Sequence, residues 1–312
     1  MKKTLVLFLC GILVSFFSME VAVRAISPLL GPPLLKWNTM EDAKTLKLKE
    51  FKNKYSTPGY VLMGNSTVLI GFNPSIFDKE AALPSGSSFN AAMNGSEIKE
   101  IRDFACRYIL REVHPKNLVI LFSNSTMAVN SNYRKLDPES SLFQRNSYVY
   151  RYRNTFRDPM TVNTLIRVLK FRDTRQGIVY RWADNLDEFG YTRYAITDTA
   201  IKDIGWDPKQ ATEEIILPLP VIDKSGLKYL EEIRDLARAK GVRLIIGTVP
   251  TLSYDPSYRL FFEQVAQYLG VGFVQGNDAV GQGKYFQDGV HLNNQGAIEF
   301  SKFLARALLG PN

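Results

Sequence analysis

Short apolar runs, each bounded by turn-forming residues, recur along this chain and predict buried β-strands. Four runs have the length of a strand: 59–63, 118–122, 242–249 and 271–274. Apolar residues recur at helical spacing in three further segments: 227–240, 258–269 and 296–309. Because strands and helices alternate, the pattern predicts the α/β class, with helices covering both faces of a parallel sheet in a three-layer α/β/α sandwich.

The alternation is lost over residues 126–216, where Arg and Tyr are frequent. A segment of this length needs structure of its own, so we expect a mostly helical insertion that borders the carboxyl-end rim of the sheet. Arg151, Arg153 and Arg157 are candidates for binding an anionic polymer or lipid phosphate, because guanidinium groups pair well with such anions. The competing interpretation is a basic surface that faces solvent.

The first 25 residues differ from the rest of the chain. Two lysines precede an uncharged apolar run over 4–19, which predicts a membrane anchor or a signal peptide. The sequence favours a retained anchor, and the alternative is secretion after cleavage near Ala25. Residues 26–58, with several prolines and a charged stretch, are predicted as a linker. The domain that follows is then expected outside the cytoplasm.

Length and composition limit the remaining choices. A chain of 312 residues, 45% hydrophobic, suffices for one sizeable domain with an insertion or for two small domains. We expect the first arrangement, with the domain over 59–125 and 217–312. Its formal net charge of +8 fits contact with an acidic envelope or anionic lipid. The targeting segment argues against nucleic acid as a partner. Of the two cysteines, Cys10 lies in the apolar run and Cys106 in a predicted helix, so no disulfide is expected within the domain.

Only two histidines are present, which restricts general-base chemistry near neutral pH to His114 or His291. His114 precedes a proline and is predicted to lie in a solvated loop. Three residues before His291 stands Asp288, on a turn that contains Gly289, and a carboxylate at this spacing can orient one ring nitrogen. The chain has no zinc-type ligand spacing and no phosphate-binding loop motif, so no metal and no cofactor are expected.

A candidate nucleophile lies far upstream. Ser66 follows the predicted strand 59–63 on the turn Gly64-Asn65-Ser66-Thr67, which places it at the sheet rim where ligands collect. The simpler interpretation is a turn serine that caps the next helix. With Asp288 and His291 following in the chain order serine, aspartate, histidine, the sequence favours a catalytic triad.

These residues resemble the SGNH (GDSL-like) hydrolases, whose blocks read Gly-Asp-Ser and Asp-x-x-His. Here the blocks are Gly64-Asn65-Ser66 and Asp288-Gly289-Val290-His291, and the resemblance covers roughly 60–125 and 240–308. The first block is similar to that of membrane-anchored extracytoplasmic members linked to polysaccharide acetylation or teichoic acid D-alanylation. The resemblance implies a flavodoxin-like order of the parallel sheet.

The resemblance also implies an oxyanion hole formed by the Ser66 N–H, the Gly95 N–H and the Asn124 side chain. Gly95 has a competing interpretation as a loop glycine before a helix capped by Ser96. The third family block lacks its glycine and aspartate here, and an ordinary turn explains Asn124 equally well. Asn65, beside the nucleophile, joins Arg151 and Arg153 as a candidate for substrate binding.

We therefore expect a serine-dependent esterase or O-acyltransferase, with acetyl as the favoured acyl group, that acts on an envelope or extracellular polysaccharide. One alternative is a catalytically weak scaffold or carbohydrate-binding subunit of an envelope polymer machine. Another is a lipid-directed esterase. Partners other than the polymer and the membrane are not indicated by the sequence.

Overall fold

The computed structural model describes residues 2–30, 40–123, 147, 149, 152, 183, 185–192, 224–250, 256–280, 283–288 and 290–310. The chain divides into two compact units. One comprises Met1–Leu46 with Leu136–Asp184, and the other, here called the sheet unit, comprises Lys47–Lys135 with Asn185–Asn312.

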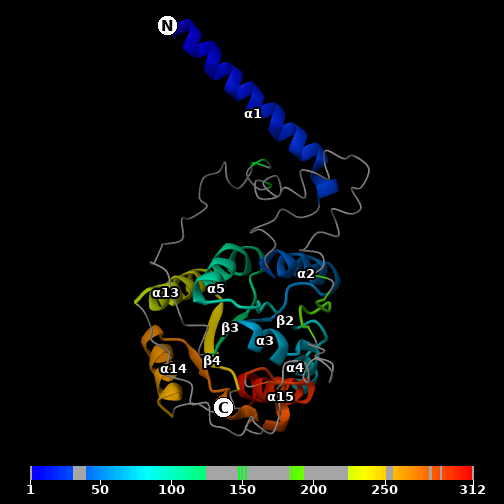
Figure 1. Ribbon diagram of the computed structural model, residues 1–312, viewed down its shortest axis with the longest axis vertical. Coiled ribbons are helices and arrows are strands. Elements are labelled where there is room, and N and C mark those ends of the chain that lie inside the picture. The colour runs from blue at the N-terminus through cyan, green and yellow to red at the C-terminus, as the bar shows by residue number, and fades with distance from the viewer. Residues whose placement is uncertain are drawn as a thin grey trace. The chain divides into compact units, whose positions relative to one another are not determined.

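A parallel sheet of five strands forms the centre of the sheet unit (Figure 1). The strands are β1 (Tyr60–Met63), β2 (Ser88–Asn90), β3 (Asn117–Phe122), β4 (Arg243–Thr248) and β5 (Gly272–Val274). Their order in space is β2-β1-β3-β4-β5, and every neighbouring pair is parallel. This is the flavodoxin-like order, so the predicted fold class is confirmed.

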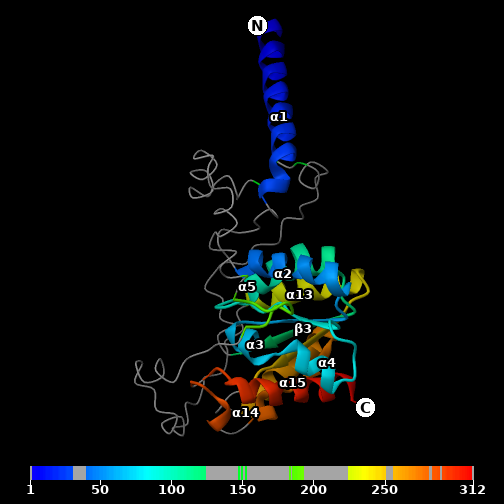
Figure 2. The same cartoon turned by 90° about the vertical axis from the view of Figure 1, so that its right-hand side faces the viewer.

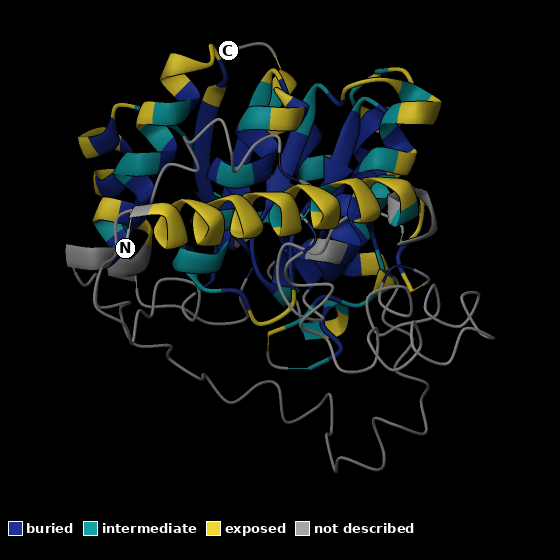
Figure 3. Ribbon diagram, turned by 90° about the horizontal axis from the view of Figure 1, so that it is seen from above, coloured by how far each residue is buried: buried dark blue, intermediate teal, exposed yellow. Residues whose placement is uncertain are grey.

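Helices cover both faces of this sheet (Figure 2). On one face lie α5 (Ile98–Phe104), α13 (Lys224–Ala239) and the part of α2 (Met40–Tyr55) that starts at Lys47. On the other face lie α3 (Ser66–Gly71), α4 (Pro74–Glu80), α14 (Pro256–Leu269) and α15 (Asn294–Leu309). Because both faces are covered, the central strand β3 is an unbroken apolar run, buried from Leu118 to Phe122. Figure 3 shows the strands at the centre of the sheet unit in the colour of buried residues.

Strand β2 was not among the predicted strands. It has only three residues, of which Ser88 and Asn90 are polar, so it lacks the apolar run that marks the other strands. Its outer edge is paired instead, since the Asn90 N–H donates to the Phe189 carbonyl at 2.9 Å. Gly190 has φ +75°, and a Cβ there would lie 2.4 Å from the Asn90 oxygen. Residues 185–192, predicted as insertion, therefore pack against the edge of the sheet.

The second half of α2 also belongs to the sheet unit. Phe51 is 1% exposed, and its ring lies 5.3 Å from that of Phe89 and 6.2 Å from that of Phe189, between centroids. The apolar residues of this helix are separated by many lysines, which made the segment resemble a solvated linker. The unit begins at Lys47, inside the linker predicted over 26–58.

Helix α5 begins later than predicted. Glu97, not Ser96, is its N-cap residue, and the Glu97 N–H donates to the Glu100 carboxylate at 3.2 Å. Ser96 donates its hydroxyl to the Met93 carbonyl at 2.9 Å. With Glu97 as the N-cap, Glu100 is the third residue of the helix, where its carboxylate completes a capping box. A helix capped by Ser96 would have no acidic residue at its third position.

A π-helix (Ala105–Val113) continues α5 and ends at His114, which is exposed with φ +54°. The exposed position agrees with the loop predicted for this histidine. Cys106 is buried within the π-helix, as predicted, and burial raises the pKa of its thiol to about 12. This thiol therefore stays protonated at physiological pH.

The other unit contains α1 (Lys2–Leu30), an apolar helix with most of its large side chains exposed. Its segment Lys3–Ile26 has 24 residues and a mean hydropathy of 2.3, enough to cross a membrane by length and composition. The helix is longer than the 16-residue apolar run because it continues past Glu20. A signal sequence has the same properties, so both predictions for this segment remain open.

Candidate active site

The turn after β1 places Ser66 at the carboxyl end of the sheet. Asn65 is the N-cap of α3, and Ser66 is the first residue of that helix. Gly64 makes the turn possible, because a Cβ there would lie 2.4 Å from Val68 Cγ2 and 2.7 Å from the Leu121 oxygen. The backbone between strand and helix thus packs directly on β3, as the prediction for a rim serine requires.

Asn65, which was predicted to bind substrate, is a buried residue with hydrogen bonds to neighbouring side chains. It is 4% exposed, and its side-chain oxygen accepts hydrogen bonds from the Thr67 N–H at 3.1 Å and the Thr67 hydroxyl at 2.6 Å. Its amide nitrogen donates to Ser123 Oγ at 2.6 Å. Both ends of the amide therefore make hydrogen bonds inside the protein, and its oxygen caps α3. Binding of substrate by Asn65 remains a prediction.

A short closed loop carries Asp288 and His291. Phe286 and Leu292 form an isolated antiparallel bridge, and the Gln287 N–H donates to the His291 carbonyl at 2.9 Å. Helix α15 begins directly afterwards, with Asn293 as its N-cap. The bridge and the helix start fix the backbone on both sides of the histidine.

Packing between helices brings this loop to α3. Leu292 is 2% exposed, and a Cβ on Gly71 at the end of α3 would lie 3.4 Å from Leu292 Cδ1 and 3.6 Å from Phe300 Cδ1. The Asn73 N–H also donates to Ser301 Oγ at 2.8 Å. Contacts of α15 with α3 and with the start of α4 thus hold the histidine loop beside the serine turn.

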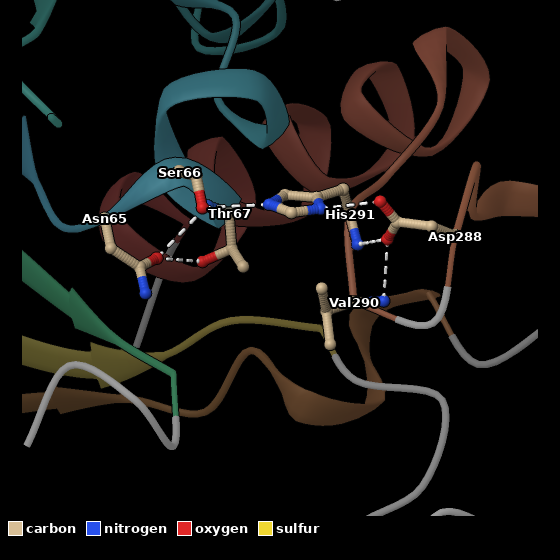
Figure 4. Close-up of polar contacts among 6 residues, drawn as sticks. All are labelled: Asn65, Ser66, Thr67, Asp288, Val290 and His291. Carbon is tan, nitrogen blue, oxygen red and sulfur yellow. Dashed lines mark hydrogen bonds and ion pairs between the residues drawn. The ribbon is translucent and has the colours of Figure 1, made fainter. Parts of the chain in front are cut away.

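Ser66, His291 and Asp288 form one chain of hydrogen bonds (Figure 4). His291 Nε2 lies 2.8 Å from Ser66 Oγ, and His291 Nδ1 lies 2.8 Å from Asp288 Oδ2. Asp288 Oδ1 accepts from the N–H groups of Val290 at 2.9 Å and His291 at 2.6 Å. The side chains of His291 and Asp288 are 22% and 27% exposed, so the group is partly accessible to solvent. The structure brings together the three residues predicted as a triad.

The hydrogen bonds to Asp288 determine its charge. Burial by itself would raise the pKa of this carboxyl group, but the bonds from the His291 ring and from two backbone N–H groups outweigh burial and lower it. Asp288 is therefore a carboxylate at physiological pH. A fixed negative charge beside Nδ1 holds the proton on that nitrogen and leaves Nε2 to accept the Ser66 proton.

Gly95 lies in the turn that follows β2, exposed and with φ +65°. The chain before it runs beside β1, since the Ala91 N–H donates to the Leu62 carbonyl at 2.8 Å and the Met93 N–H donates to the Gly64 carbonyl at 3.0 Å. This segment leads from β2 towards the turn that bears Ser66. The oxyanion role of Gly95 remains a prediction.

Several predicted site residues lie outside the described residues: Asn124, Arg151, Arg153, Arg157 and Gly289. Their assigned roles remain predictions. In the described part of the chain, no group of three or more His, Cys, Asp or Glu side chains is arranged to hold a metal ion.

Sequence reasoning missed Thr67 and Ser123, which contact Asn65 beneath the serine turn. Thr67 carried a detectable signal, because a hydroxyl two residues after an N-cap can bond to the cap. Ser123 carried none, since its contact with Asn65 depends on β1 and β3 being neighbours in the sheet.

Comparison with known proteins gives matches among solved structures alone. No protein-family model matches the chain, and no curated protein matches it. A putative acylhydrolase from Bacteroides fragilis is 14% identical, with a TM-score of 0.39, over 88% of this chain and 98% of that one. A GDSL-like lipase from Bacteroides thetaiotaomicron is 13% identical, with a TM-score of 0.36, over 80% of this chain and 86% of that one.

A third structure, described as a putative platelet activating factor from Streptococcus pneumonia, is 13% identical with a TM-score of 0.44. The match covers 91% of this chain and 96% of that one. Similarity at this level does not transfer an activity, so the function of this chain has to follow from its own site.

Proposed function

We propose that this protein is a serine-dependent esterase or O-acyltransferase in which Ser66 is the nucleophile. One observation carries the proposal: His291 Nε2 lies 2.8 Å from Ser66 Oγ while Nδ1 lies 2.8 Å from the Asp288 carboxylate. These distances are those required for a nucleophile, its base and the group that orients the base.

The reaction follows from this order of atoms. His291 Nε2 accepts the hydroxyl proton as Ser66 Oγ attacks the carbonyl carbon of an ester, and Asp288 stabilises the resulting imidazolium. Collapse of the tetrahedral intermediate breaks the bond to the alcohol, which leaves with the proton from His291. A second hydroxyl then attacks the acyl-serine and regenerates the enzyme. Water as the attacking group gives hydrolysis, and an acceptor alcohol gives acyl transfer.

Negative charge develops on the carbonyl oxygen during this attack and needs fixed hydrogen-bond donors. The Ser66 N–H is the first proposed donor, because it belongs to the same residue as the nucleophile. The Gly95 N–H is the second, at the end of the segment that passes the Gly64 carbonyl. Asn124, the residue that follows Ser123, is the proposed third.

For the substrate we propose an acyl group, with acetyl favoured, carried by an envelope or extracellular polysaccharide. Three features support it: the apolar helix α1, the net charge of +8 and the resemblance of Gly64-Asn65-Ser66 to the block of extracytoplasmic relatives. An enzyme held at a membrane by its amino terminus meets polymers of the envelope. A basic surface attracts such polymers when they are acidic.

Labelling with a fluorophosphonate, followed by mass spectrometry, tests the nucleophile directly. We expect the label on Ser66, and we expect Ser66→Ala to abolish both labelling and hydrolysis of p-nitrophenyl acetate. Ser75→Ala is the matched control, because Ser75 is an exposed serine in the first turn of α4, which also has an asparagine N-cap. Equal hydrolysis by wild type and Ser66→Ala would refute the proposal.

His291→Ala tests the base. Loss of the imidazole should lower turnover on the order of 10³-fold or more, because among the described residues it is His291 that is hydrogen-bonded to the Ser66 hydroxyl. Thermal unfolding of the variant serves as the control. A large drop in melting temperature with little change in turnover would make His291 a structural residue.

The same assays separate the alternatives. A scaffold or carbohydrate-binding subunit would bind polymer equally well as wild type and as Ser66→Ala, without Ser66-dependent hydrolysis. A lipid-directed esterase would prefer p-nitrophenyl esters of long acyl chains to the acetate. Acyl transfer would appear as product formed on an added oligosaccharide, in competition with water.

A further inference from the structure

Beneath the serine turn, three buried polar side chains form a network of hydrogen bonds. Asn65, Thr67 and Ser123 are 4%, 8% and 7% exposed. The Asn65 amide joins the other two, accepting from Thr67 and donating to Ser123 Oγ. We propose that Ser123 is a positioning residue for Ser66 that acts through Asn65, an inference that rests on the proposed role of Ser66.

The Asn65 amide has two ends of nearly equal size but opposite hydrogen-bonding character. Its oxygen must face Thr67, because the Thr67 N–H and hydroxyl both donate to it. A flipped amide would place its N–H₂ group against the Thr67 N–H, and the cap would be lost. The Thr67 N–H can only donate, so it fixes the amide with its oxygen towards α3. Ser123 Oγ, at 2.6 Å from the amide nitrogen, accepts from that nitrogen and anchors the amide from the side of β3.

This orientation determines which N–H groups of α3 remain for a substrate. The first four N–H groups of a helix have no acceptor within the helix. Asn65 supplies acceptors for three of them: its side chain for Thr67, and its carbonyl for Val68 at 3.2 Å and Leu69 at 3.0 Å. Among the described residues, none accepts a hydrogen bond from the Ser66 N–H. The cap thus fixes the turn while leaving the N–H of the nucleophile itself for the developing oxyanion.

The support for the cap comes from the neighbouring strand. Ser123 directly follows β3, and β3 also contacts the serine turn at Gly64, through the Leu121 oxygen. Strand pairing between β1 and β3 sets the distance from Ser123 to Asn65. The hydrogen bond from Asn65 to Ser123 therefore ties the first turn of α3 to the sheet. This contact fixes the direction of Ser66 Oγ and of the Ser66 N–H.

The test compares kcat and KM of purified full-length variants on p-nitrophenyl acetate. We expect Ser123→Ala to lower kcat roughly tenfold with KM changed less than about twofold, because a misplaced nucleophile impairs reaction more than binding. Ser88→Ala is the matched control. It removes the same atom from another buried serine, at the start of β2, whose hydroxyl bonds to the Pro74 carbonyl. We expect wild-type kcat for this control, and equal losses in both variants would overturn the inference.

A double-mutant cycle tests whether Ser123 acts through Asn65. If it does, Asn65→Ala with Ser123→Ala should have the kcat of Asn65→Ala alone, within about twofold. Multiplication of the two single effects would show an independent role and overturn the inference.

Asn65→Asp provides a second variant that leaves Ser123 intact, for the case in which Ser123→Ala does not fold. Aspartate keeps the oxygen that accepts from Thr67, and the Ser123 hydroxyl can reverse and donate to the other oxygen. We expect kcat of Asn65→Asp within roughly threefold of wild type. Adding Ser123→Ala to this variant should again lower kcat. A severe loss in Asn65→Asp alone would overturn the inference.

Fluorophosphonate labelling separates the two levels of the argument. Labelling of Ser66 in wild type together with an unchanged kcat in Ser123→Ala would defeat the positioning role and leave the proposed function standing. Absence of labelling at Ser66 in wild type would remove the proposed function and the positioning role with it.

Discussion

Two aspartates at opposite ends of the sheet accept hydrogen bonds from backbone N–H groups in similar ways, yet their pKa values shift in opposite directions. Asp78 on α4 accepts from the N–H groups of Gly86, Ser87 and Ser88, at 3.1, 3.0 and 3.4 Å, and so shapes the chain that enters β2. Asp288, in the loop before α15, accepts from two backbone N–H groups and from the His291 ring. Burial raises the pKa of Asp78 despite its hydrogen bonds, whereas the pKa of Asp288 is lowered.

The difference follows from exposure and from the imidazole. Asp78 is 2% exposed and bonds only to neutral donors, so removal from water dominates. Asp288 keeps 27% of its side chain exposed and faces a ring that becomes positive when it takes a proton. Asp78 therefore has a structural role, whereas the imidazole beside Asp288 makes that carboxylate one that can stabilise charge during a reaction.

The largest expected effect separates the two residues by activity. Asp288→Asn should lower kcat on p-nitrophenyl acetate on the order of 10³- to 10⁴-fold, because an amide favours the wrong tautomer of His291. Asp78→Asn, at the other end of the sheet, should keep kcat within about twofold of wild type. Comparable losses in both variants would mean that the site responds to general loosening of the fold.

Stability should show the reverse ranking. Asp78→Ala removes the acceptor of three backbone N–H groups next to β2, and leaving buried donors without a partner costs about 1–3 kcal/mol. Asp288 is partly exposed, so Asp288→Ala should cost less. Urea denaturation of both variants measures the difference. A larger loss for Asp288→Ala would contradict the structural assignment of Asp78.

The pH dependence of stability should have opposite signs. Because the folded pKa of Asp288 is lowered, its contribution is complete above the unfolded pKa and is lost as pH falls through the folded value. Because the folded pKa of Asp78 is raised, its contribution is complete below the unfolded pKa and is lost as pH rises through the folded value.

Urea midpoints of wild type, Asp288→Asn and Asp78→Asn between about pH 7 and about pH 3 measure these contributions. Towards acid pH, wild type should lose stability relative to Asp288→Asn and gain stability relative to Asp78→Asn. Parallel curves for all three proteins would show that neither carboxyl group changes its pKa on folding.

The smallest effect concerns the buried thiol. Cys106 resembles Asp78 in having its pKa raised by burial, here to about 12, so its reactive thiolate is scarce near neutral pH. Iodoacetamide at about pH 8 should leave Cys106 unmodified in the folded protein and modify it in urea. Rapid modification of the folded protein at this position would contradict the burial of the π-helix.

The sequence predicted elements whose pattern is strong over a short stretch. The apolar runs of β1, β3 and β4 and the helical spacing of α13, α14 and α15 were placed within a few residues of their observed bounds. Strand β2 was missed, because Ser88-Phe89-Asn90 is too short and too polar to differ from a loop. Its pairing with Phe189 joins residues about a hundred positions apart, and no local pattern marks such a pair.

The candidate site likewise combines features that local sequence predicted with features that only the tertiary structure shows. Local sequence determined the orientation of His291 by Asp288, since three residues on one turn suffice for that hydrogen bond, and it determined the position of Ser66 at a strand end. Only the tertiary structure decided that Ser66 Oγ and His291 Nε2, 225 positions apart, lie 2.8 Å from each other, and that Ser123 supports Asn65. Such contacts depend on the parallel order of the strands and on the packing of α15 against α3. Both are properties of the whole hydrophobic core, which no single segment encodes.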